Sequence, residues 1–354
     1  MKRPAKRSAV APPAALPAVD LRVRIGPLEL ANPVVTASGT FGYGDEYAHL
    51  MDVAALGAVI TKTVTVKPRA GNAPQRIAET PSGMLNSIGL ENVGLERFQA
   101  QKLPTLRALG ATIIASLGGE TPHELEHLLG ALGGEPGVGG FEINFSCPNV
   151  AKGGTRYWAV PRRLERTLRR LRPLTQAALI AKLPPEMALL PDLARACEAG
   201  GADALTAVNT FVGMSVDLSH MRFRIGRGTG GLSGPAIKPL ALACCAEAVR
   251  SVTIPVMGSG GIMNATDALE FIAVGATAVQ VGTLSFIRPR GALEVLDGLV
   301  APLAARGVRR LADWRGCMLR AEPAQPAAAG PSSSPRKTAR AARAASAARL
   351  QRKA

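Results

Sequence analysis

The sequence is poor in aromatic residues and lacks long apolar runs, and both shortages limit what the chain can be. Aromatic residues make up 4% of the 354 residues and hydrophobic residues 47%, so a core must consist mainly of Ala, Val, Leu and Ile. No run approaches the roughly 18 continuous apolar residues of a membrane span. The basic N-terminus is interrupted by several prolines, which makes it a poor signal peptide. We expect a cytoplasmic chain without a membrane segment.

Cysteine is also scarce, and its spacing argues against a disulfide framework. The five cysteines, which show no regular spacing, are Cys147, Cys197, Cys244, Cys245 and Cys317. This pattern indicates a reducing compartment. His123 and His127 stand at i and i+4, but no Glu or third ligand accompanies them in a zinc pattern. We expect no metal site.

A net charge of +16 is typical of a nucleic-acid-binding protein, but its distribution along the chain argues against that function. Residues 1–19 carry a local charge of +4, and residues 321–354, which are rich in Ala, Ser, Pro and Arg, carry +6. The tails therefore hold most of the charge, and their composition is typical of disorder. We expect a disordered basic extension at 1–19, one folded domain at 20–310 and a low-complexity, disordered basic tail at 321–354, with no specific nucleic-acid partner.

Apolar, strand-like runs alternate with amphipathic helical stretches from residue 33 onward. The expected strands are Pro33–Thr36, Ala58–Thr61, Thr112–Leu117, Gly140–Phe145, Ala178–Leu183, Ala204–Val208, Ile254–Met257 and Ala278–Val281. The expected helices are Glu46–Leu56, Leu95–Leu109, Pro122–Leu132, Pro161–Leu171, Pro191–Ala199, Ile237–Val249, Ala265–Val274 and Gly291–Ala305. Eight alternations, with strands apolar on both faces, favour an α/β fold with a parallel sheet closed into a (β/α)8 TIM barrel.

Two further patterns refine this fold. An open doubly wound sheet is the alternative, but the glycines of Ser38–Gly44 have the wrong spacing for a dinucleotide-binding loop. Residues 21–30 alternate apolar and polar around Gly26-Pro27, which predicts a short N-terminal β-hairpin covering one end of the domain.

Polar and small residues gather where the predicted strands end. In a barrel these ends form a single rim that carries the chemistry. Lys62, Asn144, Cys147, Lys182 and Asn209 all fall at such ends. Taken singly, a lysine there is more often a surface cation and a cysteine more often a small buried hydrophobe. Their concentration on one rim favours a functional site.

The last two strand ends suggest a phosphate site. Gly260-Gly261 and Gly282-Thr283 leave backbone N–H groups open to close approach, and a helix begins after Asn264. With Lys62 and Lys182 reaching inward, flavin mononucleotide (FMN) fits, because an ammonium stabilises the negative charge of a reduced flavin. The structural alternative is that these glycines only serve tight turns.

Four amides suit a flat heterocycle with alternating C=O and N–H groups. They are Asn86, Asn144, Asn149 and Asn209, with Asn86 expected on a loop. Cys147, as a thiolate, could remove a proton beside a carbonyl; a nucleophilic role competes with this, although no histidine lies nearby in sequence to activate it.

Several long motifs in order resemble the class 1 dihydroorotate dehydrogenases. The motifs span residues 32–42, 62–65, 71–76, 83–92, 144–150, 230–239 and 258–262, and the likeness runs from about Val19 to Gly307. The Asn86 region and Gly153-Gly154 are more similar to the B-type catalytic chain than to the fumarate-using A-type. The B-type resemblance implies FMN on this chain and a heterotetramer, in which a partner chain with FAD and a [2Fe–2S] cluster passes electrons to NAD⁺.

The resemblance also implies roles for individual residues. Cys147 would be the base for C5 of dihydroorotate, with hydride passing from C6 to flavin N5. Substrate contacts would be Lys62, Asn86, Ser87, Ile88, Gly89, Leu90, Asn144, Asn149, Asn209 and Thr210. Flavin contacts would be Ser38, Lys62, Thr63, Ser116, Asn144, Lys182, Val208, Gly234, Gly260, Gly261, Gly282 and Thr283.

Some positions depart from the family pattern, and other functions remain open. Ser116 stands where the family usually has Asn, Tyr157-Trp158 replaces Phe-Gly after the catalytic loop, and Glu186 replaces Asn. The alternatives are a dihydropyrimidine dehydrogenase-like chain acting on uracil or thymine, an A-type fumarate-using enzyme, and a binding barrel that has lost its chemistry. Lys62 and the Asn86 loop favour a carboxylated ring.

Overall fold

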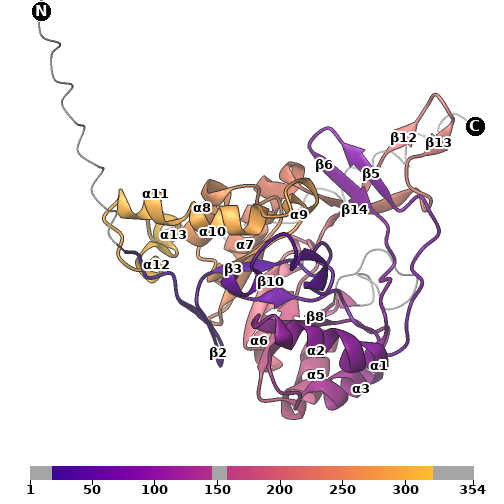
Figure 1. Ribbon diagram of the computed structural model, residues 1–354, viewed down its shortest axis with the longest axis horizontal. Helices are drawn as coiled ribbons and strands as arrows, with labels where there is room; N and C mark the ends of the chain where they lie inside the picture. The colour runs from indigo at the N-terminus through magenta and orange to yellow at the C-terminus, as the bar shows by residue number, and fades with distance from the viewer. Residues whose placement is uncertain (1–17, 146–157, 322–354) are drawn as a thin grey trace, which may run out of the picture. The chain divides into compact units, whose positions relative to one another are not determined.

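Short strands buried on both faces form the centre of the fold (Figure 1). The computed structural model describes residues 18–145 and 158–321. The chain divides into two units, Met1–Arg320 and Ala321–Ala354, and the description below concerns the first. Its eight-stranded parallel sheet comprises β3 (Val34–Thr36), β4 (Val59–Ile60), β7 (Ile113–Leu117), β8 (Val138–Asn144), β9 (Ala178–Lys182), β10 (Ala204–Ala207), β15 (Val256–Ser259) and β16 (Ala278–Val281). Each of them overlaps one of the eight predicted strands.

The sheet closes on itself to make a barrel. Its strand order is β3-β16-β15-β10-β9-β8-β7-β4, so the first two strands in sequence stand at the two edges. A parallel bridge between Val35 and Ala58 joins those edges, and the Thr36 N–H donates to the Ala58 carbonyl at 3.2 Å. The predicted (β/α)8 TIM barrel is therefore confirmed.

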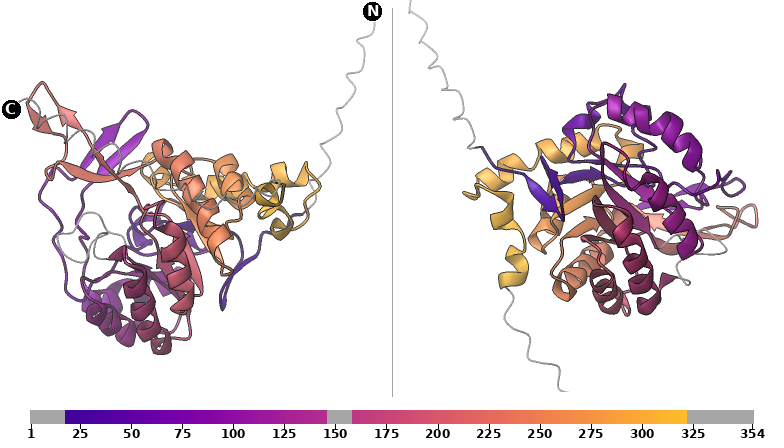
Figure 2. Two further views of the ribbon diagram at one scale, coloured as in Figure 1. Left: turned by 180° about the vertical axis from the view of Figure 1, so that it is seen from behind. Right: turned by 90° about the horizontal axis from the view of Figure 1, so that it is seen from below.

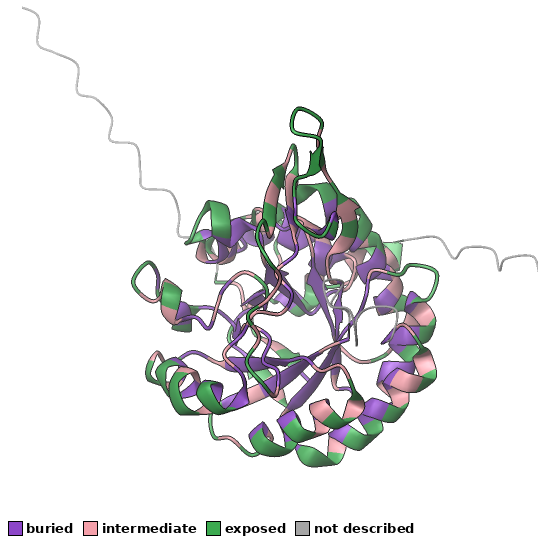
Figure 3. Cartoon of the chain, turned by 90° about the vertical axis from the view of Figure 1, so that its right-hand side faces the viewer, coloured by how far each residue is buried: buried purple, intermediate pink, exposed green. Residues whose placement is uncertain are grey.

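Amphipathic helices surround the barrel, with their apolar faces inward and their outer faces exposed (Figures 2 and 3). The longer ones are α3 (Pro122–Leu132), α5 (Pro161–Leu171), α6 (Leu190–Ala199), α7 (Lys238–Ser251) and α8 (Ala265–Ala273). In α3, Pro122 occupies the first turn, where no N–H is needed, and the Thr121 hydroxyl caps the helix by accepting from the Glu124 N–H. Buried leucines at 125, 128, 129 and 132 then form the stripe that packs on the sheet.

Three predicted helices differ from the structure. Residues 46–56 hold two 3₁₀ turns, η1 (Asp45–Tyr47) and η2 (Val53–Ala55), because the Asp52 carboxylate accepts from the Ala54 N–H and starts a new turn. Residues 95–109 form α1 (Leu95–Arg97), a π-helical turn η3 (Phe98–Lys102) and α2 (Leu103–Ala108), and Pro104 in that stretch has no N–H for a regular ladder. The last predicted helix is divided at Gly298.

The remaining short helical elements lie between the barrel strands or after the last of them. They are η4 (Arg172–Leu174), η5 (Pro235–Ile237), α9 (Leu284–Ile287), α10 (Gly291–Asp297), α11 (Val300–Ala304), α12 (Leu311–Trp314) and α13 (Cys317–Ala321). Residues beyond 310 are tied to the barrel, since the Trp314 indole N–H donates to the Leu269 carbonyl and the Arg315 guanidinium to the Thr277 hydroxyl. The predicted domain limits at 20 and 310 remain a prediction.

The N-terminal hairpin is present and closes the end of the barrel opposite the strands' carboxyl ends. It consists of β1 (Val23–Ile25) and β2 (Leu28–Leu30). Its buried Ile25 and Leu30 form an apolar cluster with inward-facing residues of the strands, among them Ile60, Ile114 and Ile180. This apolar cluster therefore closes the barrel at the amino-terminal ends of its strands.

A second sheet, absent from the sequence-based prediction, stands over the opposite end. Its order is β11 (Phe211–Met214), β14 (Thr229–Ser233), β6 (Gly83–Asn86) and β5 (Ile77–Thr80), and the pair β12 (Val216–Asp217) and β13 (Arg222–Phe223) extends beyond it (Figure 1). Asn86 was expected on a loop, but it is the last residue of β6 and pairs with Gly231. The sheet brings this amide over the rim.

Candidate active site

A cavity of about 460 Å³ lies at the carboxyl ends of the barrel strands, beneath the second sheet. Its wall includes residues at the ends of several strands, such as Lys182 at the end of β9, Val208 after β10 and Gly282 after β16. Inward-facing residues alternate along each strand, so the terminal one faces the opening of the barrel. This is the end at which barrels carry their chemistry.

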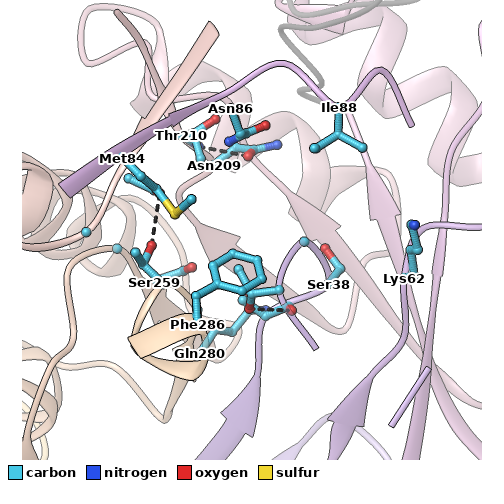
Figure 4. A pocket seen from close by; sticks show the side chains of 18 of the residues that line it. Ser38, Lys62, Met84, Asn86, Ile88, Asn209, Thr210, Ser259, Gln280 and Phe286 are labelled. Atoms are coloured by element: carbon cyan, nitrogen blue, oxygen red, sulfur yellow. Dashed lines mark hydrogen bonds between the residues drawn. The ribbon is translucent and has the colours of Figure 1, made fainter. Parts of the chain in front are cut away.

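Most of the residues predicted for the site line this cavity (Figure 4). They are Ser38, Lys62, Thr63, Asn86, Ile88, Gly89, Leu90, Asn144, Lys182, Val208, Asn209, Thr210, Gly234, Gly260, Gly261, Gly282 and Thr283. Ser87 and Ser116 do not line it. Cys147 and Asn149 lie outside the described residues. The prediction of one common rim thus agrees with the position of all but two of the described residues.

A buried polar network forms the floor under Lys182. The Lys182 ammonium donates to the Gln280 amide oxygen at 3.0 Å and lies 3.4 Å from the Glu142 carboxylate. The Gln280 amide nitrogen and the Thr206 hydroxyl both donate to the other oxygen of Glu142. Glu142 and Thr206 are completely buried, and Lys182 is only 5% exposed. A cation is therefore held in a region from which water is largely excluded, where its charge acts strongly.

Sequence reasoning missed Glu142, Thr206 and Gln280, although a signal was available. Each lies two residues before a predicted site residue at the end of the same predicted strand or directly after it: Glu142 before Asn144, Thr206 before Val208 and Gln280 before Gly282. Side chains two residues apart along a strand point to the same face. A carboxylate or amide in an otherwise apolar strand on the inward face indicates a buried polar layer.

Amides and a hydroxyl gather on the side of the cavity beneath the second sheet. Figure 4 shows Asn86, Asn209 and Thr210 close together, with Lys62 and Ser38 farther round the wall. The Asn86 amide donates to the Gly231 carbonyl at 3.2 Å, and the Asn209 amide donates to Asn144 at 3.3 Å. The first contact lies within the second sheet and the second joins two strand ends of the barrel, so donors and acceptors are fixed on both sides of the cavity.

The turn after β6 is fixed by hydrogen bonds from Asn72, on the side facing away from the cavity. The Asn72 amide donates to the carbonyl and the hydroxyl of Ser87, which explains why Ser87 is buried away from the cavity. Gly89 and Leu90 follow with φ of 76° and 57°, so the backbone turns sharply at this point. The buried Ser87 therefore anchors the turn, while its neighbours face the cavity.

Ser116 lies behind Thr63, which lines the cavity, and does not reach the cavity itself. Its hydroxyl is hydrogen-bonded to that of Thr63 at 2.9 Å, and its N–H donates to the Thr61 hydroxyl. Because Ser116 is completely buried, any effect it has on a ligand passes through Thr63. Of the other departures from the family pattern, Trp158 is buried against the Phe145 ring at 5.0 Å between centroids, and Glu186 is exposed.

Two glycine-containing loops close the opposite end of the cavity. Gly260 and Gly261 follow β15 with φ of 129° and 76°, and a Cβ at Gly261 would lie 2.7 Å from the Cβ of Lys238. Only glycine fits this approach to α7 without strain. β15 and β16 are the seventh and eighth barrel strands, whose loops commonly bind phosphate.

Side chains around these loops are already engaged. The Lys238 ammonium donates to Asp267 at 2.6 Å, and this hydrogen bond, with that to Glu270, raises the pKa of Lys238. Asp267 also accepts from the Met263 N–H at 2.9 Å and so holds the loop after Gly261. Asn264 caps α8, as the sequence predicted. These contacts fix the position of the loop against α7 and α8.

One edge of the cavity is lined by apolar side chains, unlike the amide and glycine regions described above. Ile77, Met84, Met263 and Phe286 line it, and Phe286 is 50% exposed at the edge. On another side Tyr47 donates its hydroxyl to the Thr40 carbonyl, and burial raises the pKa of this phenol, which keeps it neutral. Ser233 and Thr283 are joined at 2.9 Å next to the glycine loops. None of these positions was predicted except Thr283.

The part of the chain that the structure describes contains neither a metal-binding cluster of side chains nor a membrane-spanning helix. In residues 18–145 and 158–321, no group of three or more His, Cys, Asp or Glu side chains is placed to hold a metal ion. Over the same ranges, every helix is too short or too polar to cross a membrane.

Comparison with known proteins gives a consistent result. A family model described as "Dihydroorotate dehydrogenase" matches residues 20–303. The "Dihydroorotate dehydrogenase B (NAD(+)), catalytic subunit" of Trichlorobacter lovleyi is 48% identical over 298 residues, covering 84% of this chain and 98% of the relative. The protein of the same name from Pelobacter propionicus is 47% identical, with coverages of 84% and 98%. Among solved structures, DHODH from Eimeria tenella in complex with ferulenol has a TM-score of 0.73 at 23% identity, covering 85% and 89% of the two chains.

Proposed function

The chain belongs to the dihydroorotate dehydrogenase family and is an oxidoreductase, and we propose that it oxidises (S)-dihydroorotate to orotate in pyrimidine biosynthesis, with FMN as its cofactor. The observation that carries this proposal is the cavity at the strand ends, in which two lysines and three amides meet paired glycine loops. Those groups suit a phosphorylated flavin and a flat, carboxylated ring lying together.

The residues around the cavity fit FMN. The volume of about 460 Å³ lies within the range of roughly 300–1,000 Å³ found for cofactor and ligand sites. The loops at Gly260-Gly261 and Gly282-Thr283 would hold the phosphate, and Ser38, Thr63, Gly234 and Val208 would border the ring system. When bound, FMN supplies an acceptor for the hydride that leaves the substrate.

Lys182 would stabilise negative charge on the reduced cofactor from a floor that excludes water. Its 5% exposure means that the ammonium is little screened. Lys62, which also lines the cavity, would contact the flavin and pair with the carboxylate of the substrate. Lys182 would therefore serve the cofactor alone, and Lys62 both ligands.

The proposed substrate contacts surround the ring on the side of the second sheet. Asn86, Asn144, Asn149 and Asn209 would match its C=O and N–H groups, and Thr210 with the turn at residues 87–90 would complete the wall. Cys147, which follows β8 after Asn144, would remove the proton from C5 as a thiolate. Asn149 and Cys147 belong to the proposal on sequence grounds alone.

The relatives' name, catalytic subunit, implies a second kind of subunit. We propose that this chain forms a dimeric core that passes electrons to NAD⁺ through a partner chain carrying FAD and a [2Fe–2S] cluster, as a cytoplasmic heterotetramer. The term NAD(+) in the relatives' name supports this B-type assignment over the fumarate-using A-type.

An anaerobic absorbance spectrum of the purified chain tests the proposal. We expect a flavin band near roughly 450 nm that bleaches when dihydroorotate is added and remains when dihydrouracil is added. Bleaching by dihydrouracil alone would favour a dihydropyrimidine dehydrogenase-like activity. A well-folded chain that takes up no flavin would contradict the proposal.

The acceptor requires a second measurement on the reduced chain. We expect reoxidation by NAD⁺ only after an FAD and iron–sulfur partner chain is added, and no rapid reoxidation by fumarate. Fast turnover with fumarate in the isolated chain would instead indicate the A-type.

A further inference from the structure

The buried polar layer beneath the cavity has an unusual internal arrangement. Lys182 is paired across the sheet with Thr206 of β10 and Asn144 of β8, and Glu142 lies one inward-facing position below Asn144. Gln280 reaches the same point from β16. Residues of four strands therefore meet in this layer, and one carboxylate, Glu142, and one neutral amide, Gln280, contact the ammonium.

The amide of Gln280 can have only one orientation in this layer. Glu142 accepts hydrogen bonds from both the Gln280 amide nitrogen, at 2.5 Å, and the Thr206 hydroxyl, at 2.9 Å. A carboxylate accepts and does not donate, so the nitrogen of the amide must face Glu142. The amide oxygen then necessarily faces Lys182, from which it accepts at 3.0 Å.

The contact between Lys182 and Glu142 is long for an ion pair. Its N···O distance is 3.4 Å, whereas Lys102 lies 2.7 Å from Asp45 and Lys238 lies 2.6 Å from Asp267 in the same chain. Lysine–carboxylate hydrogen bonds normally measure about 2.7–2.9 Å. Yet Lys182 and Glu142 are more deeply buried than either of the other pairs, so their attraction should be the stronger one. A further contact of one of these two side chains must therefore keep the ammonium from approaching the carboxylate more closely.

We propose that Gln280 is a positioning residue that keeps the Lys182 ammonium at the cavity by competing with Glu142 for it. Its oxygen accepts from the ammonium at 3.0 Å, closer than the 3.4 Å contact of the ammonium with Glu142 Oε1, while its nitrogen donates to Glu142 Oε2. The ammonium stays accessible to a ligand, since Lys182 and Gln280 both line the cavity (Figure 4 labels Gln280). The inference rests on the proposed flavin site, because its functional consequence is stabilisation of the reduced cofactor.

The first test replaces Gln280 with methionine, which has similar length but no amide. We expect the ammonium to close onto Glu142, and a crystal structure of the flavin-free Gln280→Met chain should show the distance between Nζ and Oε shortened to about 2.8 Å. This measurement needs neither flavin nor substrate. A distance that stays near 3.4 Å would overturn the proposal.

The second test measures the two-electron reduction potential of bound flavin against a reference dye. Withdrawal of the ammonium should weaken binding of reduced flavin relative to oxidised flavin about tenfold, which lowers the potential by about 30 mV. Binding of oxidised flavin should change little, because the phosphate loops are untouched. An unchanged potential in a folded, flavin-loaded Gln280→Met chain would contradict the functional part.

A rescue experiment separates positioning from general damage to the core. Adding Glu142→Gln to Gln280→Met removes the carboxylate that captures Lys182, so the potential should rise back to the wild-type value or above it. A potential that stays low in the double variant would overturn the proposal. If Gln280→Met does not fold, Gln280→Asn, which withdraws the amide oxygen by one methylene, should lower the potential in the same direction.

Failure of the proposed function would look different. A wild-type chain that takes up no flavin would remove the flavin site but leave the predicted shortening of the distance between Lys182 and Glu142 to be measured in the apo chain.

Discussion

At the residue scale, the proposal depends most on Cys147, and its replacement gives a direct prediction. A serine hydroxyl is a far weaker acid than a thiol, so Cys147→Ser should lose roughly 10²–10⁴-fold in the rate of flavin reduction by dihydroorotate. The flavin should remain bound, because all proposed cofactor contacts except Asn144 lie outside β8 and the segment that follows it. Rapid-mixing absorbance measures the rate, and the flavin content of the purified variant is the control. A variant with the full wild-type rate at neutral pH would show that another group is the base.

The three cysteines that the structure shows to be buried, Cys197, Cys244 and Cys245, should behave in the opposite way. Burial raises the pKa of Cys244 to about 11 and of Cys245 to about 12, and it also raises that of Cys197. At a pH of about 8 almost none of these thiols is ionised, and only the thiolate reacts.

We therefore expect these three thiols to react with a disulfide reagent only as fast as the folded chain opens. Mass spectrometry after timed modification checks this at each site, and denaturant, which should expose all five cysteines, is the control. Labelling of Cys197 or Cys245 within seconds in the folded chain would mean that their burial is wrong.

Site residues at strand ends could be predicted from the sequence, because side chains alternate regularly between the two faces of a strand. Asn144, Lys182 and Asn209 were identified in this way and line one cavity. Glu142 and Gln280 were not, although they share the same alternation, since their partners come from strands far apart in the sequence: 138 residues separate them. Pairing across a barrel cannot be derived from local periodicity alone.

At the scale of elements, the loop after β15 illustrates how a glycine can be required by its surroundings. Gly261 has φ of 76°, and a Cβ there would meet the side chain and backbone of Lys238 at 2.7–2.8 Å. Gly261→Ala should therefore lower the melting temperature and weaken FMN binding, because the loop must move away from α7.

A matched glycine in α3 supplies the control for this prediction. Nothing lies within 4 Å of a Cβ added at Gly130, which is exposed and helical. Gly130→Ala should stabilise the chain by roughly 1 kcal/mol through helix propensity and leave flavin affinity unchanged. Thermal unfolding and flavin titration measure both variants. Equal effects of the two substitutions would show that neither φ nor packing constrains Gly261.

Predicted elements differ from the structure mainly where the chain leaves the barrel. Strands and amphipathic helices such as α3 and α5 have strong periodicity and came out close to their true bounds. The second sheet did not, because β6, β11 and β14 contain glycines and lack a continuous apolar face. Such strands are stabilised by pairing with one another, and their sequence resembles that of a loop.

At the scale of the whole molecule, the charge is distributed unevenly between the barrel and the segment that follows it. Residues 322–354 carry seven Lys or Arg and one Glu, so a chain ending at Ala321 would have a net charge of +10 in place of +16. Helices α12 and α13 precede this point, and contacts of Trp314 and Arg315 tie them to the barrel. The segment from 322 onward is therefore the natural piece to remove.

We expect a chain ending at Ala321 to keep its melting temperature, its flavin and its rate of reduction by dihydroorotate. Every residue proposed for the site precedes position 284, and hydrophobic burial in the barrel does not depend on a segment so poor in large apolar residues. Retention on an anionic polymer should fall and become less dependent on salt, since fewer counterions are released per chain. If truncation unfolds the chain or releases the flavin, the segment belongs to the catalytic unit and the proposed domain limits are wrong. If only retention on the polymer changes, the basic segment acts separately from catalysis, and a search for its partner should use the full chain with the truncated one as the reference.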